Sequence, residues 1–161
     1  MNSNGPDSYR KQRAAYIELA SNGIGADTFI TLVTNQTWEL SKMQRAIKAF
    51  VGCTDHSLLG KKWWQMPVDC RTEGIFFIEH VASNTHAHGM LRLPQRHQDD
   101  QRDIKILLEQ HWNKLAPGGS LDFQTLHDAV GCADYCTKEM QFEHFRDEQI
   151  VCTWDFAKRQ N

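Results

Sequence analysis

Two apolar segments separated by a short polar turn constrain the fold of this chain more than any other feature. The segments are "GIFFIEHV" (74–81) and "HAHGMLRL" (86–93), and the "SNT" between them is typical of a turn. They predict two strands that pair as an antiparallel hairpin. Because successive side chains of a strand point to opposite faces, His86 and His88 would lie on the same face of that hairpin.

The segments on either side of the hairpin predict a split β-α-β core. β-branched, aromatic and alternating patterns indicate further strands at 27–34, 120–126 and 149–156. Helical spacing of apolar residues indicates helices at 8–21, 37–52, 99–119 and 127–140. We therefore expect an α+β fold: a central antiparallel sheet of ferredoxin-like or RRM-like topology, with helices on one face and the other face free to carry a site.

Length and composition predict one globular domain that does not enter a membrane. The 161 residues are 40% hydrophobic, with no repeat, linker or long apolar stretch, so we expect a single domain over 1–161 with a helical extension at 1–26. The N-terminus has no apolar signal region, and an odd count of five cysteines favours reduced thiols in an intracellular protein. The net charge of −2 argues against strong binding to intact duplex DNA.

A carboxylate on the first strand of the hairpin is placed to join the two histidines. Glu79 stands seven residues before His86, so a tight turn would bring it across from both imidazoles. Two nitrogens and one oxygen form an open ligand set. Such a set suits Mn²⁺, or Mg²⁺ when phosphate oxygens and water complete the shell, and would tolerate Zn²⁺ or Co²⁺.

A second candidate group lies in "DYCTKE". Tyr135 and Lys138 are three residues apart and would share one face of a helix. A tyrosine beside an ammonium group can attack a phosphodiester, because the cation favours the phenolate and offsets charge on the phosphoryl group. The alternative is a core tyrosine beside a surface lysine.

Taken together and in this order, "FITLVTNQ", "IEHVASNTHAHGML" and "ADYCTKEM" resemble the three motifs of the HUH endonucleases, the superfamily of rolling-circle replication initiators (Rep). The resemblance covers roughly residues 27–140. It implies that His86, His88 and Glu79 hold a divalent metal, Mn²⁺ or Mg²⁺. It also implies that Tyr135 is the nucleophile that keeps the 5′ end of cut single-stranded DNA, and that Lys138 is the lysine of the Y-x-x-K motif.

The resemblance implies a function and its partners as well. The expected enzyme nicks and joins single-stranded DNA at a specific sequence, as a single-tyrosine initiator of rolling-circle replication or transposition. Its partners would be single-stranded origin DNA and a helicase, from the same chain or the host, and the isolated chain would be a monomer. It would work in a bacterial cytoplasm, or in the host cell or nucleus of a virus or mobile element. Since no helicase segment follows, the chain is either a small stand-alone initiator or the nuclease domain of a longer protein.

A basic and aromatic stretch is the predicted DNA contact. Lys61, Lys62, Trp63 and Trp64 lie in "GKKWWQMP", which interrupts regular structure, and bases stack on exposed indoles while lysines follow the phosphates. The alternative is that the two tryptophans belong partly to the core. We expect the other histidines to have no special role, and His80 to point away from Glu79 along the strand.

Two other classes of protein fit parts of the pattern. A metal-free RRM-like module would bind single-stranded nucleic acid on the same sheet, but it would need aromatic platforms where the central strands carry a carboxylate. A zinc-binding structural domain would use Cys132 and Cys136 with His127 or His144, although no C-x-x-C knuckle is present.

Overall fold

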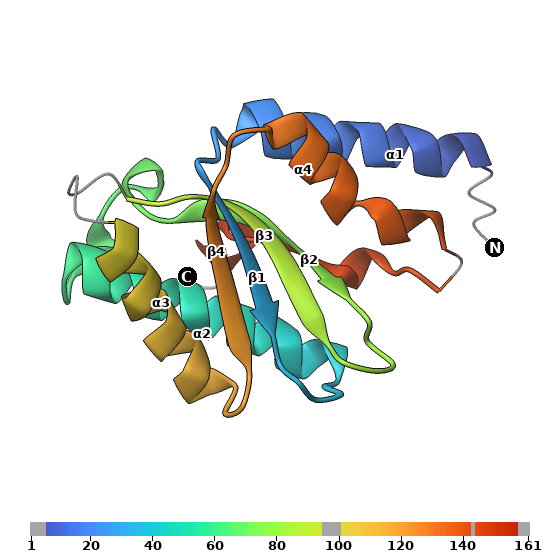
Figure 1. Ribbon diagram of the computed structural model, residues 1–161. Helices are drawn as coiled ribbons and strands as arrows, with labels where there is room; N and C mark the ends of the chain where they lie inside the picture. The colour runs from blue at the N-terminus through green and yellow to red at the C-terminus, as the bar shows by residue number, and fades with distance from the viewer. Residues whose placement is uncertain (1–5, 95–100, 143, 158–161) are drawn as a thin grey trace.

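A computed structural model describes residues 6–94, 101–142 and 144–157 of the chain, and its centre is a five-stranded antiparallel sheet (Figure 1). The strand order is β4-β1-β3-β2-β5. The strands are β1 (Thr28–Val33), β2 (Glu73–Glu79), β3 (His86–Arg92), β4 (Ser120–Thr125) and β5 (Ile150–Cys152). The first four follow the order of a ferredoxin-like split βαβ fold, and β5 adds to the free edge of β2. The predicted α+β class and topology are confirmed.

The helices lie on both faces of the sheet. They are α1 (Pro6–Glu18), α2 (Leu40–Leu59), α3 (Gln101–Leu115), α4 (Ala129–Cys136) and the short α5 (Trp154–Ala157). Figure 1 shows α2 and α3 against one face, with α1 and α4 over the other. The expectation of helices on one face only therefore needs correction. The N-terminal extension and the segment after β4 each carry apolar side chains that pack on the second face, so this face is partly covered.

The larger core lies between the sheet and the α2–α3 pair. Met43, Ile47 and Phe50 are buried along α2, and Leu108 and Trp112 along α3, as their helical spacing predicts. Each such side chain, fully buried, contributes roughly 1.5–3 kcal/mol to the folded state. The two helices therefore bury this face of the sheet.

The hairpin has the register on which the site depends. In the β2–β3 pairing, Glu79 stands opposite His86 and Phe77 stands opposite His88. β2 is buried on both faces, which explains its uninterrupted apolar run. β3 leaves no room for a side chain at Gly89, because a Cβ there would come within 3.0 Å of side-chain atoms of Phe76 and Ile30.

Several predicted elements differ in length from the structure. The helix predicted over 37–52 begins at Leu40 and continues to Leu59. The last strand is three residues long rather than 149–156, because Thr153 Oγ1 accepts the Gly74 N–H and the chain then turns into α5. The helix predicted over 127–140 ends at Cys136. Thr137 turns its hydroxyl back onto the Ala133 carbonyl, and a 3-10 turn (η4, Lys138–Gln141) follows. In the described part of the chain, no helix is both long and apolar enough to span a membrane.

Candidate functional site

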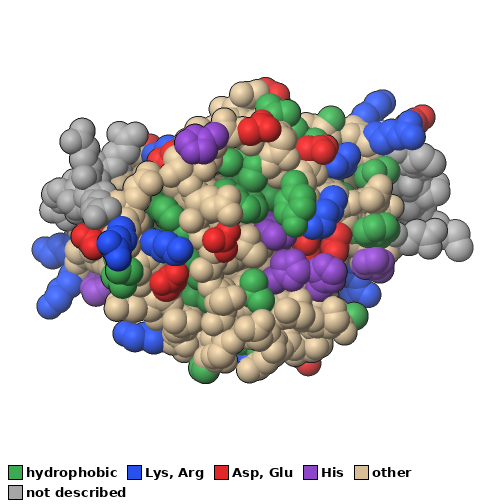
Figure 2. All heavy atoms as spheres, viewed as in Figure 1, with side chains coloured by type: hydrophobic (Ala, Val, Ile, Leu, Met, Phe, Trp, Pro, Cys, Tyr) green, Lys and Arg blue, Asp and Glu red, His purple; other side chains and the backbone are tan. Residues whose placement is uncertain are grey.

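Glu79, His86 and His88 converge on the sheet face that α1 and α4 partly cover. Glu79 Oε2 lies 3.1 Å from His86 Nε2 and 3.3 Å from His88 Nε2. Figure 2 shows histidine, acidic and basic side chains gathered on this face of the molecule. The hairpin register thus brings together the three residues that the sequence predicts as metal ligands.

The Nδ1 atom of each imidazole lies within hydrogen-bond distance of a neighbouring group, and this orients both Nε2 atoms toward the Glu79 carboxylate. His86 Nδ1 lies 3.1 Å from the Asn84 carbonyl oxygen, which can only accept, so this nitrogen carries the proton. His88 Nδ1 lies 3.1 Å from Thr31 Oγ1, and Phe29 stacks on the His88 ring with centroids 5.7 Å apart. Such outer contacts are what orients histidines that bind metals.

The carboxylate is ionised despite its burial. Glu79 is only 1% exposed, and burial by itself would raise its pKa. The hydrogen bond with His86, the nearby His88 and the charge of Lys138 outweigh burial and lower the pKa of Glu79 to about 2. In return, the hydrogen bond with Glu79 raises the pKa of His86, although burial opposes this.

Two atoms of the cluster lack hydrogen-bond partners within the described part of the chain. Glu79 Oε1 is buried and makes no hydrogen bond, and His88 Nε2, although 3.3 Å from Glu79 Oε2, does not form one either. Buried polar atoms without hydrogen bonds are costly in a protein interior. In neutral His86 the Nε2 lone pair also faces Glu79 Oε2, so a proton or a cation is needed between them. One ligand atom from each of the three residues lies within 4.8 Å of the others. This donor set fits a divalent metal ion.

Tyr135 and Lys138 lie next to the same cluster. The Tyr135 ring packs edge-on against His88 with centroids 5.2 Å apart, and Tyr135 is half exposed. Lys138 Nζ lies 3.8 Å from the centre of the Tyr135 ring and 3.3 Å from Glu79 Oε2. Burial opposes the charge on Lys138, but Tyr135 and Glu79 outweigh it and raise its pKa. The predicted proximity is therefore present, although Lys138 stands in the turn after α4 rather than on the helix.

The N-terminal extension holds the helix that carries Tyr135. Arg13 of α1 donates hydrogen bonds to Thr137 Oγ1 at 3.1 Å, to the Asp134 carbonyl at 3.0 Å and to Asp134 Oδ1 at 2.9 Å. At the other end of α4, Asp128 Oδ1 accepts the Gly131 N–H. The extension is thus part of the structure around the site. No local pattern in the sequence predicts this contact, because Arg13 is more than a hundred residues from its partners.

His80 also belongs to this region, contrary to the expectation that it points away. β2 ends at Glu79, and His80 adopts a left-handed backbone with φ of 53°. Its ring stacks on that of His86, with centroids 4.7 Å apart, and its Nε2 lies 3.5 Å from Glu139 Oε1. The alternation of side chains along a strand does not hold beyond the end of the strand.

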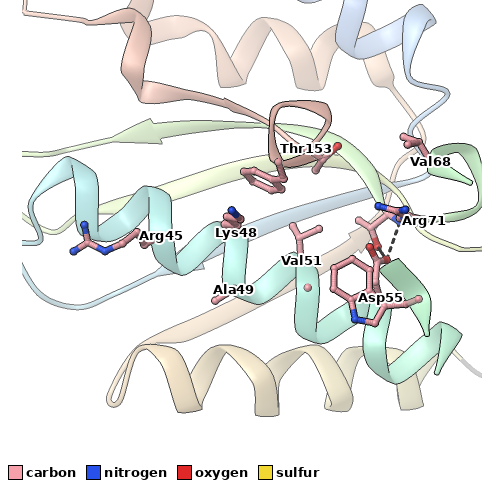
Figure 3. A pocket seen from close by; sticks show the side chains of 12 residues that line it. Arg45, Lys48, Ala49, Val51, Asp55, Val68, Arg71 and Thr153 are labelled. Atoms are coloured by element: carbon pink, nitrogen blue, oxygen red, sulfur yellow. Dashed lines mark hydrogen bonds between the residues drawn. The ribbon is translucent and has the colours of Figure 1, made fainter. Parts of the chain in front are cut away.

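The predicted DNA-binding stretch lies apart from the cluster. Lys61, Lys62, Trp63 and Trp64 precede the Glu73 end of β2, whereas Glu79 is at the other end. Trp63 packs against Gly52 of α2 and the Arg71 guanidinium, and it lines a pocket of about 590 Å³ on the α2 side (Figure 3). Lys61, Lys62 and Trp64 are exposed. The structure does not bring these four residues to the histidine cluster, and their role in DNA binding stays a prediction.

The alternative zinc site has no support in the described part of the chain. There, the groups of three or more ligand-type residues with close donor atoms include neither Cys132 nor Cys136. Cys132 and Cys136 are both free thiols. The neighbouring Cys132 and burial raise the pKa of the Cys136 thiol, whereas the contact with Cys136 lowers the pKa of Cys132.

No family model, curated protein or solved structure matches this chain.

Proposed function

We propose that this chain is a metal-dependent endonuclease of the HUH type, which nicks and rejoins single-stranded DNA through a phosphotyrosine on Tyr135. The observation that carries the proposal is the proximity of two groups of side chains on one face of the sheet. Tyr135 and Lys138 lie in contact with the ligand set of Glu79, His86 and His88. These five residues come from three separate segments of the chain. They are also the residues that the resemblance to Rep proteins implies.

Glu79, His86 and His88 would hold the divalent cation. Bound there, the cation would withdraw charge from the scissile phosphate and orient it. The buried Nε2 of His88, which makes no hydrogen bond among the described residues, fits this role, since ligation would satisfy it. Mn²⁺ or Mg²⁺ suits the set, with phosphate oxygens and water as the remaining ligands.

Tyr135 would supply the nucleophile and Lys138 the charge beside it. The phenol oxygen attacks phosphorus, the bond to the 3′ oxygen breaks, and the 5′ phosphate remains on the tyrosine. The phenol proton is lost and the departing 3′ oxygen takes up a proton, so a free 3′-OH results. Rejoining is the same step in reverse. Tyr135 is half exposed, and the Lys138 ammonium, 3.8 Å from the centre of its ring, would stabilise negative charge there.

The test uses the full chain, a pool of single-stranded oligonucleotides and Mn²⁺. We expect a covalent adduct that withstands denaturation, whose sequencing identifies the cleaved site and whose peptide analysis places the phosphate on Tyr135. Tyr135→Phe should bind DNA almost unchanged yet form no adduct, and chelation of the metal should prevent the reaction. An adduct at Tyr9 or Tyr16, or undiminished cleavage in chelator, would contradict the proposal.

A second test compares cleavage of single-stranded and fully paired DNA. A strand must be splayed for its phosphate to reach Tyr135 in line, so cleavage of a linear, fully paired oligonucleotide with the selected site should be much slower than that of the single strand. Binding without any adduct, on either substrate, would instead favour the RRM-like binding module.

A further inference from the structure

A second set of ligand-type side chains lies next to the first and shares one residue with it. Glu79, His80 and Glu139 each offer a donor atom within 4.8 Å of the other two. Neither His80 nor Glu139 is used by the proposed cleavage reaction. His80 comes directly after β2, and Glu139 stands in the 3-10 turn that follows α4.

The second set contains two buried carboxylates and one buried carboxylate oxygen that makes no hydrogen bond among the described residues. Glu79 and Glu139 are both buried, with exposed fractions of 1% and 8%, and two buried carboxylates this close repel each other. Lys138 contacts Glu79 through Oε2, which also faces His86 and His88. The other oxygen, Oε1, is buried and has no hydrogen-bond partner in the described residues. A carboxylate can bridge two cations, with one oxygen directed to each.

The two sets do not merge into one. In the described chain, the atoms of Glu79, His86 and His88 form one close group and those of Glu79, His80 and Glu139 form another. Two ligands on one Mg²⁺- or Mn²⁺-sized ion are separated by at most roughly 4.2 Å, which is twice a bond of about 2.1 Å. A single ion would therefore not be reached by all five residues without a rearrangement.

The backbone conformation of His80 and a cavity beside it are compatible with a bound cation. A left-handed conformation is uncommon for any residue but glycine, and here it turns the His80 ring toward His86 and Glu139. His80 and Glu139 also line a cavity of about 490 Å³ that Ser83 and Arg146 border. An ion and its water ligands have a route to these two side chains.

We infer that Glu79, His80 and Glu139 form a second binding site for a divalent cation, next to the Glu79, His86 and His88 set and bridged to it by Glu79. One imidazole and two carboxylates are ligands typical of Mn²⁺, with Mg²⁺ or Zn²⁺ as alternatives. The inference concerns cation binding and shares Glu79 with the proposed nuclease site, but it does not require that the chain cleave DNA.

The test is the number of Mn²⁺ ions that the full chain binds, measured by equilibrium dialysis with metal analysis, without DNA. We expect about two ions per chain, with a magnetic coupling between them in the electron paramagnetic resonance spectrum, as for ions that share a carboxylate. The double variant His80→Asn/Glu139→Gln should bind about one ion and lose the coupling. Asparagine is chosen because it accepts a left-handed backbone. His127→Asn, at an exposed histidine outside both sets, is the matched control and should bind as the unmodified chain does.

The outcomes separate this inference from the proposed function. One ion per chain, unchanged in the double variant and lost in His86→Gln/His88→Gln, would leave the first site intact and make His80 and Glu139 an ordinary ion pair, overturning the inference alone. No bound ion in the unmodified chain would overturn both metal sites. The coupled spectrum of the unmodified chain decides the question even if the double variant fails to fold.

Discussion

Lys138 Nζ lies 3.3 Å from Glu79 Oε2, so an ammonium group already approaches the carboxylate that would bind the metal. A metal ion at Glu79 and the lysine repel each other. Lys138→Met should therefore tighten Mn²⁺ binding by about fivefold, a modest factor because the lysine side chain is 36% exposed and screened by water. The same variant should slow DNA cleavage, since it removes the cation beside Tyr135. Titration calorimetry and a nicking assay measure the two effects.

Lys138→Arg keeps the charge and is the matched control for this experiment. It should bind Mn²⁺ with nearly unchanged affinity. Weaker Mn²⁺ binding by Lys138→Met would show that the lysine supports the metal site rather than competing with it.

Glu79→Gln should abolish metal binding at the first site without unfolding the domain. Glutamine has the same size and can still hydrogen-bond to His86, but it lacks the charge that makes Glu79 a ligand. We expect the affinity for Mn²⁺ to fall by more than roughly 100-fold. Because an ion that binds only the folded state raises the Tm, the Mn²⁺-dependent rise in Tm should disappear. Glu73→Gln, at the other end of β2, should retain it. A full Tm rise in Glu79→Gln would exclude Glu79 as a ligand.

Arg13→Ala should impair cleavage while leaving metal binding unchanged. The arginine joins α1 to Asp134, which directly precedes Tyr135, and to Thr137, which directly precedes Lys138. Because the Asp134 side chain is 62% exposed and that of Arg13 28% exposed, water screens the pair, and we expect the free energy of unfolding to fall by only about 0.5–1.5 kcal/mol. Single-turnover cleavage rates and Mn²⁺ titrations separate the effects. Arg10→Ala, at an exposed position of the same helix, should behave as the unmodified chain, and equal rates for the two variants would exclude a positioning role for Arg13.

Asp55→Asn should stabilise the domain at neutral pH and have little effect in acid. Asp55 is 2% exposed; burial raises its pKa above 3.8, although hydrogen bonds from Thr72 to its Oδ1 oppose this. A carboxyl whose pKa is higher in the folded state favours folding below its unfolded pKa and loses that contribution as the pH rises through the folded pKa. Asparagine keeps the acceptor oxygen and does not ionise, so its advantage should grow with pH over that window, by about 1.4 kcal/mol for each unit of pKa elevation.

Chemical denaturation across the acidic and neutral range measures this difference. Asp69→Asn, at an exposed aspartate, is the control and should show no such pH-dependent gain. A constant difference between Asp55→Asn and the unmodified chain at every pH would contradict the buried, ionising carboxyl.

Trp64→Ala and Trp63→Ala should have different effects. Trp64 is 51% exposed, so its loss should leave stability nearly unchanged but weaken single-stranded DNA binding by about 1–3 kcal/mol if a base stacks on it. Trp63 packs against Gly52 and Arg71, so its loss should lower the free energy of unfolding. Fluorescence anisotropy and denaturation measure the two quantities, and Mn²⁺ binding should stay unchanged in both. Unaltered DNA affinity in Trp64→Ala would remove the stretch from the DNA-binding surface.

The sequence by itself determined the hairpin and the three residues that converge on it. A strand repeats every two residues and a short turn restricts the pairing, so local information is enough to place Glu79 opposite His86 and on the same face as His88. The same holds for the buried stripes of α2 and α3, whose helical period shows in the spacing of their apolar residues.

Only the tertiary structure decided what surrounds these residues. Helix α4 ends at Cys136, and the turn that follows brings Lys138 to Glu79 and Glu139 to His80. No periodic pattern in the sequence predicts either contact. The left-handed backbone of His80 ends the alternation of β2, and Arg13 reaches α4 across more than a hundred residues. Such contacts arise when separate elements pack together, and their geometry depends on the whole fold rather than on any local pattern of residues.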